Sequence, residues 1–289
     1  MFFTLLVGGL ISGSIYGITG MGYSLIYKAS GLMNLSQGEL LMLGAYFGYT
    51  LYGVLGLPFP LALVITAIFM FIIGYLMNSA IITRLLNKNG NLSSVILCTM
   101  AISMIFQNGT RLIWGSNSKN FPNIFDLEPI PVFGTAIAYE QILVLVMAII
   151  CMFTLHIFMT KTVFGTGMRA AALDSEAASV LGINVQRTKG ITWGISSALA
   201  GIIGCTVGPL MSVFSTMGAI IGNKAFGSAV IGGYGNVYGT LLGGVLYGIV
   251  ETLIAGYVST SFKDMISFAL LIVCLIFMPN GIFNEKVLE

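Results

Sequence analysis

Two glutamates are the acidic residues closest to the long apolar stretches of this chain. Glu39 precedes an uncharged run that continues to Thr83, and Glu251 follows one that begins at Ala225. A charge at the bilayer centre costs on the order of 3 kcal/mol or more, so both glutamates are candidates for a polar path. Glu39 also fits a capping box with Ser36, in which both side chains bond free helix amides. Glu251 either faces such a path or ends its helix at the interface.

Other residues with catalytic or metal-binding chemistry are scattered. The single His156 lies in an apolar run without acidic or cysteine neighbours. The cysteines lie singly in separate apolar runs, which predicts buried thiols; they are Cys98, Cys151, Cys205 and Cys274. An enzyme site needs convergent groups of these types. We therefore expect no catalytic residue and no metal site in this chain.

Two glycine-containing turns interrupt apolar runs, one in each half of the sequence. They are Asn34-Leu35-Ser36-Gln37-Gly38-Glu39 and Gly232-Gly233-Tyr234-Gly235-Asn236. A break in a membrane helix is tolerated only where protein or a water-filled cavity satisfies its backbone groups. Paired breaks in corresponding halves point to a substrate path. The candidate path residues are Asn34, Gln37, Glu39, Gly232, Gly233, Gly235 and Glu251.

The composition places these groups in a membrane protein. The chain is 57% hydrophobic and 8% charged, against roughly 25% charged residues in soluble domains. About 20 apolar residues span a bilayer, and the uncharged runs are long enough for this. We expect one all-α domain over residues 1–289, a polytopic bundle of about eight (8–10) transmembrane helices with broken or re-entrant segments. The expected helices are 3–27, 40–57, 60–83, 93–113, 139–160, 190–210, 225–258 with a break, and 264–281.

The spacing of the glycines predicts how the helices pack, and the positions of the basic residues predict how the chain is oriented in the membrane. Glycines recur every four residues in several runs, for example at Gly9, Gly13 and Gly17. Small residues at this spacing let membrane helices approach closely. Basic residues at Lys28, at Arg84 and in the segment 161–189 fall on one side by helix parity, which predicts that this side is cytoplasmic and the N-terminus external. The side of the C-terminus stays open.

The segment 161–189 is a charged loop that lipid cannot accept. It contains Lys161, Arg169, Asp174, Glu176 and Arg187 around an alanine-rich stretch that favours a helix. A short amphipathic helix of this kind suits a groove on another protein. No GxxxxGK[ST] motif occurs, so the chain does not bind ATP through a P-loop. The net charge of +2 gives no reason to expect nucleic acid as a partner.

Several motifs resemble one family. Glu176-Ala177-Ala178-Ser179-Val180-Leu181-Gly182 resembles the EAA motif of permease subunits of bacterial ABC importers. The surrounding segment from Gly167 to Val185 resembles the branched-chain amino-acid permeases in particular, as do the two turns and Gly248-Ile249-Val250-Glu251. The tail Pro279-Asn280-Gly281-Ile282-Phe283 is similar to the family's closing motif, with Met278 in place of its usual arginine. These matches extend over nearly the whole chain.

The resemblance implies a multi-pass permease of the bacterial plasma (inner) membrane that imports branched-chain amino acids. The implied partners are a second membrane permease subunit (a paralogue or an identical chain), two cytoplasmic ATPase subunits that bind ATP and Mg, and an external solute-binding protein. The loop 161–189 would be a cytoplasmic coupling loop whose helix seats in the ATPase. Its implied coupling residues are Arg169, Asp174, Glu176, Ala177, Ala178 and Gly182.

Other interpretations stay open at this point. Urea, amides or other small polar solutes are alternative substrates, since the motifs specify the family more than the cargo. An ion-coupled secondary transporter would explain broken helices and intramembrane acids, but not the docking loop. A structural scaffold would explain the glycines alone.

Overall fold

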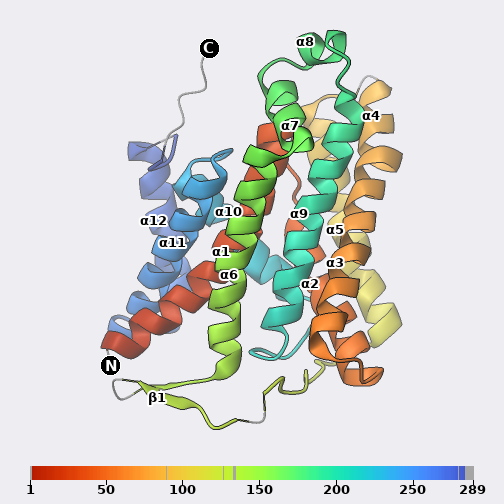
Figure 1. Ribbon diagram of the computed structural model, residues 1–289. Helices are drawn as coiled ribbons and strands as arrows, with labels where there is room; N and C mark the ends of the chain where they lie inside the picture. Colours follow the sequence, from red (N-terminus) through yellow and green to blue (C-terminus); the bar gives the residue numbers. More distant parts are fainter. Residues whose placement is uncertain (1, 89, 126, 133–134, 279, 284–289) are drawn as a thin grey trace.

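The computed structural model shows a bundle of helices (Figure 1) and describes residues 2–283 except 89, 126, 133–134 and 279. Pro279 of the expected tail motif therefore lies outside the described residues. The helices are α1 Phe2–Ser30, α2 Gln37–Gly48, α3 Phe59–Leu76, α4 Thr83–Asn87, α5 Leu92–Trp114, α6 Tyr139–Lys161, α7 Val163–Leu173, α8 Ser175–Val180, α9 Val185–Val207, α10 Met217–Gly232, α11 Val237–Tyr257 and α12 Lys263–Phe277. π-Helical turns η1 (Tyr49–Val54) and η2 (Met77–Ile82) extend α2 and α3.

Six helical stretches of the described chain are long and apolar enough to cross a membrane. They are α1, the continuous stretch Phe59–Asn87, α5, α6, α9 and α11. The segments α2 with η1, α10 and α12 are shorter. The helical membrane bundle is thus confirmed, and the described residues also include a short pair of strands. Strands β1 (Ile130–Val132) and β2 (Thr135–Ile137) pair antiparallel in the loop before α6.

Glycines fix the approach of α1 to α11, as their spacing predicts. A Cβ atom added to Gly13 would lie 2.6 Å from the Cα atom of Val245, and one added to Gly9 would lie 2.6 Å from that of Ile249. Real Cβ atoms do not approach backbone so closely, so only glycine permits this packing. The two helices consequently lie in backbone contact.

Helices α2 and α10 both begin inside the bundle instead of at its surface. Gln37, in the first turn of α2, donates from Nε2 to the carbonyl of Ser196, in the middle of α9 (3.1 Å). A Cβ atom added to Gly38 would lie 2.8 Å from the Cα of Gly222 in α10. The expected helix start at residue 40 is therefore three residues late, and that at 225 is eight residues late. The N-terminal parts of both half-helices meet at the centre.

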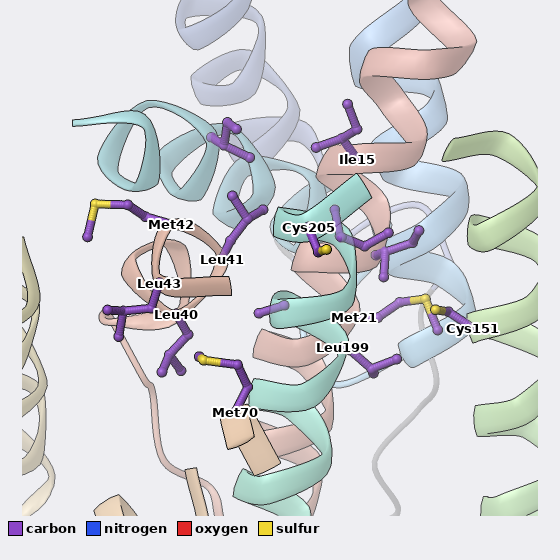
Figure 2. Close-up of a cluster of buried hydrophobic side chains, with 14 of the residues drawn as sticks. Ile15, Met21, Leu40, Leu41, Met42, Leu43, Met70, Cys151, Leu199 and Cys205 are labelled. Carbon is purple, nitrogen blue, oxygen red and sulfur yellow. The ribbon is translucent and has the colours of Figure 1, made fainter. Parts of the chain in front are cut away.

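The apolar core surrounds these half-helices. Figure 2 shows Leu40, Leu41 and Leu43 of α2 gathered with Met70 of α3 and Leu199 of α9. All of these side chains are buried. Close packing of this kind holds the start of α2, and hence Glu39, in one place.

Candidate functional site

Glu39 lines a pocket of about 260 Å³ between the starts of α2 and α10 and the middle of α5. The pocket combines this one acidic group with aromatic, thioether, hydroxyl and amide groups. Its lining residues are Tyr23, Leu35, Gly38, Glu39, Met100, Ser103, Met104, Gly218, Ala219, Gly222, Asn223 and Phe226. The mouth is open, because Met100, Met104, Ala219 and Asn223 are exposed.

The carboxylate of Glu39 is buried and largely unpartnered. The residue is 3% exposed. Its Oε1 accepts one long hydrogen bond, from the Ser103 hydroxyl (3.5 Å), and its Oε2 has no hydrogen-bond partner. Among the described residues no cation lies within ion-pair distance of Glu39. A buried polar group without partners is costly, so the arrangement requires an explanation beyond stability.

The capping box expected at this position does not form. Ser36 precedes α2 but makes no capping hydrogen bond through its side chain. Its hydroxyl and its amide both donate to Oδ1 of Asn34, at 2.6 and 3.1 Å. Because the Ser36 amide donates to Asn34, it is not available to the Glu39 side chain, which lies at the pocket instead. The local interpretation of Glu39 was therefore wrong.

Two helix N-termini support a negative charge at this point. Glu39 lies in the first turn of α2, and its Oε2 lies so close to Gly218 that a side chain there would collide with it. Gly218 belongs to the first turn of α10. The amides of a first helical turn have no partner within the helix and carry partial positive charge. The two helix ends therefore offset part of the cost of burying a charged carboxylate here.

Asn34 and Gln37 lie apart from this pocket. Gln37 accepts from the Ser196 hydroxyl (3.1 Å) and donates to the Ser196 carbonyl, and Asn34 donates weakly to Gln37 (3.4 Å). Both side chains are fully buried. These hydrogen bonds connect the start of α2 to α9 and position the first turn of α2.

Glu251 lies in a second pocket, of about 380 Å³, but there it is part of a charged cluster. The Lys224 ammonium lies 2.5 Å from Oε1 of Glu251 and 2.8 Å from Oδ1 of Asp264. Lys263 lies 3.9 Å from the same Glu251 oxygen, and the Tyr16 ring is 5.7 Å from Lys224. Glu251 and Lys224 are both buried. The cluster joins α10, α11 and α12 beside α1.

Three residues at these sites were not predicted from the sequence: Lys224, Ser103 and Gly218. Lys224 is the only charged residue between Lys189 and Glu251, so its isolation in an apolar region was a usable signal. Ser103 and Gly218 are ordinary residues of membrane helices, and only the packing of α5 and α10 against α2 brings them to Glu39.

The second glycine turn does not join the first. Gly233 and Gly235 adopt positive φ angles of 100° and 99° and reverse the chain between α10 and α11. The Gly235 amide donates to the Ser24 hydroxyl (3.3 Å), and the Asn236 side-chain amide donates to the Phe283 carbonyl (2.8 Å). None of Gly232, Gly233 and Gly235 lines either pocket. The partner of the first break is instead the start of α10.

Helices α7 and α8 form a projecting tip at one end of the bundle, opposite the start of α1 (Figure 1). Thr162 caps α7 by accepting from the Gly165 amide (3.0 Å). Asp174 caps α8 by accepting from the amides of Glu176 (2.9 Å) and Ala177 (3.0 Å). Gly182 follows α8 with a φ of 85°, which favours glycine. The expected helix in the loop is thus two helices with a sharp corner.

The tip exposes apolar side chains. Leu173, Val180 and Leu181 are 86%, 88% and 80% exposed. Arg169, Glu176 and Ala177 are exposed around them, whereas Ala178 is buried against the rest of the tip. Grouped apolar side chains on a projection mark an interaction surface. Ala178 supports the shape of this surface from inside instead of forming its face.

The remaining candidate groups have simple surroundings. His156 Nδ1 lies 2.6 Å from the Tyr238 hydroxyl. All four cysteines are free thiols; Cys151 and Cys205 are buried, and Cys98 and Cys274 are half-buried.

Comparisons with known proteins agree over nearly the whole chain. A sequence model of the family described as "Branched-chain amino acid transport system / permease component" matches residues 5–275. The high-affinity branched-chain amino acid transport system permease protein LivH of Salmonella typhimurium is 32% identical, over 97% of this chain and 95% of LivH. The permease protein LivM of the same organism is 21% identical, over 93% of this chain and 67% of LivM.

A solved structure shares the fold. A chain of PsaBC from Streptococcus pneumoniae, determined in complex with Fab, superimposes with a TM-score of 0.51 and 14% identity. The match covers 96% of this chain and 92% of that one.

Proposed function

The chain belongs to the family of branched-chain amino acid transport system permease components, and from this premise we propose that it is the membrane-spanning permease subunit of an ATP-driven importer. Its cargo is leucine, isoleucine, valine or a closely related small polar solute. The chain moves this cargo across the membrane and does no covalent chemistry. ATP and Mg are bound by partner subunits.

The projecting tip carries the proposal. It has capped helices, a glycine corner and exposed Leu173, Val180 and Leu181. The turn at Gly182 and the caps at Thr162 and Asp174 would hold α7 and α8 as one unit. The apolar side chains would supply contact area for a cytoplasmic ATPase subunit. Closure of the ATPase would then push on α7 and α8, which join α6 to α9 directly. Rigid-body movement of packed helices is a common way to transmit such a change.

The Glu39 pocket supplies the polar part of the path. Half-helices that begin within the membrane are typical of transporter substrate sites. The meeting of α2 and α10 beside an open pocket follows this arrangement. Glu251 is assigned to the charged cluster beside this path, and Asn34 and Gln37 to the support of the α2 start. The Gly232–Gly235 turn would act as a hinge between α10 and α11.

The topology and partners follow from the same premise. Six long helices, α2–η1, α12 and the segment that ends with α10 would give nine crossings, an odd number that puts the two ends of the described chain on opposite sides. The N-terminus would be external in a bacterial plasma membrane and the tip cytoplasmic. Phe283 lies at the same end as Tyr27, beside the Gly235 turn, so the C-terminal end would be cytoplasmic too.

Salmonella typhimurium has both LivH and LivM, which favours a paralogue as the second permease subunit of this transporter. An external solute-binding protein would deliver the cargo.

The test is uptake of radiolabelled L-leucine, L-isoleucine, L-valine and urea by proteoliposomes that contain the chain with its co-purified subunits. We expect ATP-dependent uptake of the branched-chain amino acids when the solute-binding protein is present. A Leu181→Glu variant should insert normally but lose most of the ATPase subunit on purification, because a charge would replace an apolar contact.

Gln186→Glu is the matched control, since residue 186 is also exposed but lies beyond the tip. It should retain the ATPase and full uptake. Uptake driven by an ion gradient without any ATPase subunit would contradict the proposal and favour a secondary transporter.

A further inference from the structure

Resting on the proposed function, we propose that Glu39 binds the α-ammonium group of an amino acid in transit through the Glu39 pocket. Three features of the pocket carry this inference: an unpartnered carboxylate oxygen, an aromatic pair beside it and an apolar wall.

The carboxylate has no cation within ion-pair distance among the described residues, and Arg111 acts on it only from farther away. Glu39 is 3% exposed and lines the pocket; its Oε2 has no hydrogen-bond partner and lies against Gly218 in the pocket wall. Buried charges in proteins are normally paired. The helix N-termini hold the carboxylate in place but leave its second oxygen free. A charged donor from a ligand would form the short, strong hydrogen bonds that ammonium and carboxylate groups make.

Aromatic rings beside the carboxylate suit the same ligand group. The rings of Tyr23 and Phe226 pack edge to face, with centroids 5.7 Å apart, and both residues line the pocket. The Tyr23 hydroxyl donates to the Gly222 carbonyl (3.4 Å), which fixes this ring against α10. The faces of aromatic rings attract ammonium groups. The cation-binding character of the pocket therefore does not depend on Glu39 alone.

The rest of the pocket fits a small aliphatic side chain. Met100 and Met104 of α5 form a flexible apolar wall at the mouth. The volume of about 260 Å³ is below the roughly 300–1,000 Å³ of sites for drug-sized ligands. The Asn223 amide and the first turn of α10 offer donors for a carboxylate. The combination matches a zwitterion with an apolar side chain better than it matches an uncharged amide.

In the second pocket the Oε2 of Glu251 also has no hydrogen-bond partner, but the carboxylate there is already in an ion pair. Its glutamate is held by Lys224 at 2.5 Å, and Lys224 also contacts Asp264. A ligand there would have to displace an existing ion pair, whereas a ligand at Glu39 would complete an unfilled one. This difference selects Glu39 as the residue that contacts the substrate.

The first experiment measures L-leucine uptake by the complete reconstituted transporter with Glu39→Gln. The amide keeps the shape of the side chain but loses the charge, so we expect uptake to fall at least tenfold while ATPase association stays normal. Glu39→Asp should recover part of the activity. Glu140→Gln is the matched control, because Glu140 is also buried in a first helical turn but lies on α6 outside both pockets; it should transport normally.

The second experiment detects binding directly and remains informative if Glu39→Gln assembles poorly. A Met104→Cys change places a thiol at the pocket mouth, in a background with Cys98→Ala and Cys274→Ala. High L-leucine should slow maleimide labelling of this thiol in the complete transporter, whereas 4-methylpentanoate, which lacks the ammonium group, should not. Adding Glu39→Asp should weaken the protection.

The outcomes separate the two proposals. A wild-type transporter that does not carry L-leucine would overturn the proposed function. If the wild-type transporter carries L-leucine and the Glu39→Gln variant carries it equally well, the role of Glu39 is overturned and the proposed function stands. Equal protection of the thiol by L-leucine and 4-methylpentanoate would have the same consequence.

Discussion

Glu39 and Glu251 are buried to the same degree, at 3% and 4% exposure, but their surroundings differ in charge. Glu251 contacts Lys224 directly and lies within 4 Å of Lys263. Glu39 accepts one long hydrogen bond from Ser103 and lies beside the N-termini of α2 and α10. A paired charge holds helices together, because removing either partner leaves the other exposed to a low dielectric. An unpaired charge held by rigid helices is available to a ligand.

The largest effect that would separate the two regions is expected from Lys224→Met. It would leave Glu251 buried without its closest cation, which costs about 3–5 kcal/mol of unfolding free energy. Denaturant unfolding of the purified chain in detergent measures this loss. Lys263→Met should have a far smaller effect, since Lys263 is 37% exposed and 3.9 Å from Glu251. The double change Lys224→Met with Glu251→Gln should regain most of the loss; no recovery would show that Lys224 acts mainly through other contacts.

The next largest effect concerns the packing that places Glu39. Gly38→Ala would bring a methyl group within 2.8 Å of the Gly222 Cα and force α2 away from α10. Overpacking of this kind costs about 1–3 kcal/mol, and L-leucine uptake should fall with it. Gly109→Ala on α5 is the control, because nothing lies within 4 Å of its added Cβ. If Gly38→Ala unfolds and transports like the control, the contact between the half-helices does not position the site.

A smaller effect is expected at a third acid, Asp174, whose role is local. Asp174→Ala removes the cap of α8, which is worth about 1 kcal/mol. Hydrogen exchange should speed up in residues 175–182 only, and ATP-driven uptake should decline. Asp174→Asn retains the acceptor oxygen and should behave as the unchanged chain. Exchange that stays slow after Asp174→Ala would mean that contacts of the tip, and not the cap, hold α8.

The smallest effect on stability is expected from Glu39→Gln. The substitution removes a buried charge and keeps an oxygen that can accept from Ser103, so the unfolding free energy should change by less than about 1 kcal/mol. Denaturant unfolding of Glu39→Gln and Lys224→Met under the same conditions compares the stability contributions of the two regions directly. A loss as large as that of Lys224→Met would reveal a structural partner of Glu39 and remove the contrast between the two glutamates.

Much of the fold could be predicted, because the length of each apolar run and the polar residues at its ends set the bounds of a membrane helix locally. The expected helix 139–160 is α6 within one residue at each end, and 93–113 is α5 within one residue. The errors fall where tertiary contacts decide the local structure. Asn34 accepts from the amide of Ser36, so that amide is not available to Glu39 for the expected capping box. The paired strands β1 and β2 have three residues each, which is too short to show an alternating pattern in the sequence.

The sequence by itself determined that this is a helical membrane protein with a charged, alanine-rich loop, because lipid excludes charges and accepts apolar helices wherever they occur. It also marked Glu39 and Glu251 as costly charges. Only the tertiary structure decided what became of each. Lys224 lies 27 positions from Glu251 and meets it through the packing of α10 on α11. Gly218 and Ser103 reach Glu39 from distant parts of the chain, and neither supplies a positive side chain. Long-range packing, which no local pattern encodes, paired Glu251 with Lys224 and left Glu39 without a cation at ion-pair distance among the described residues.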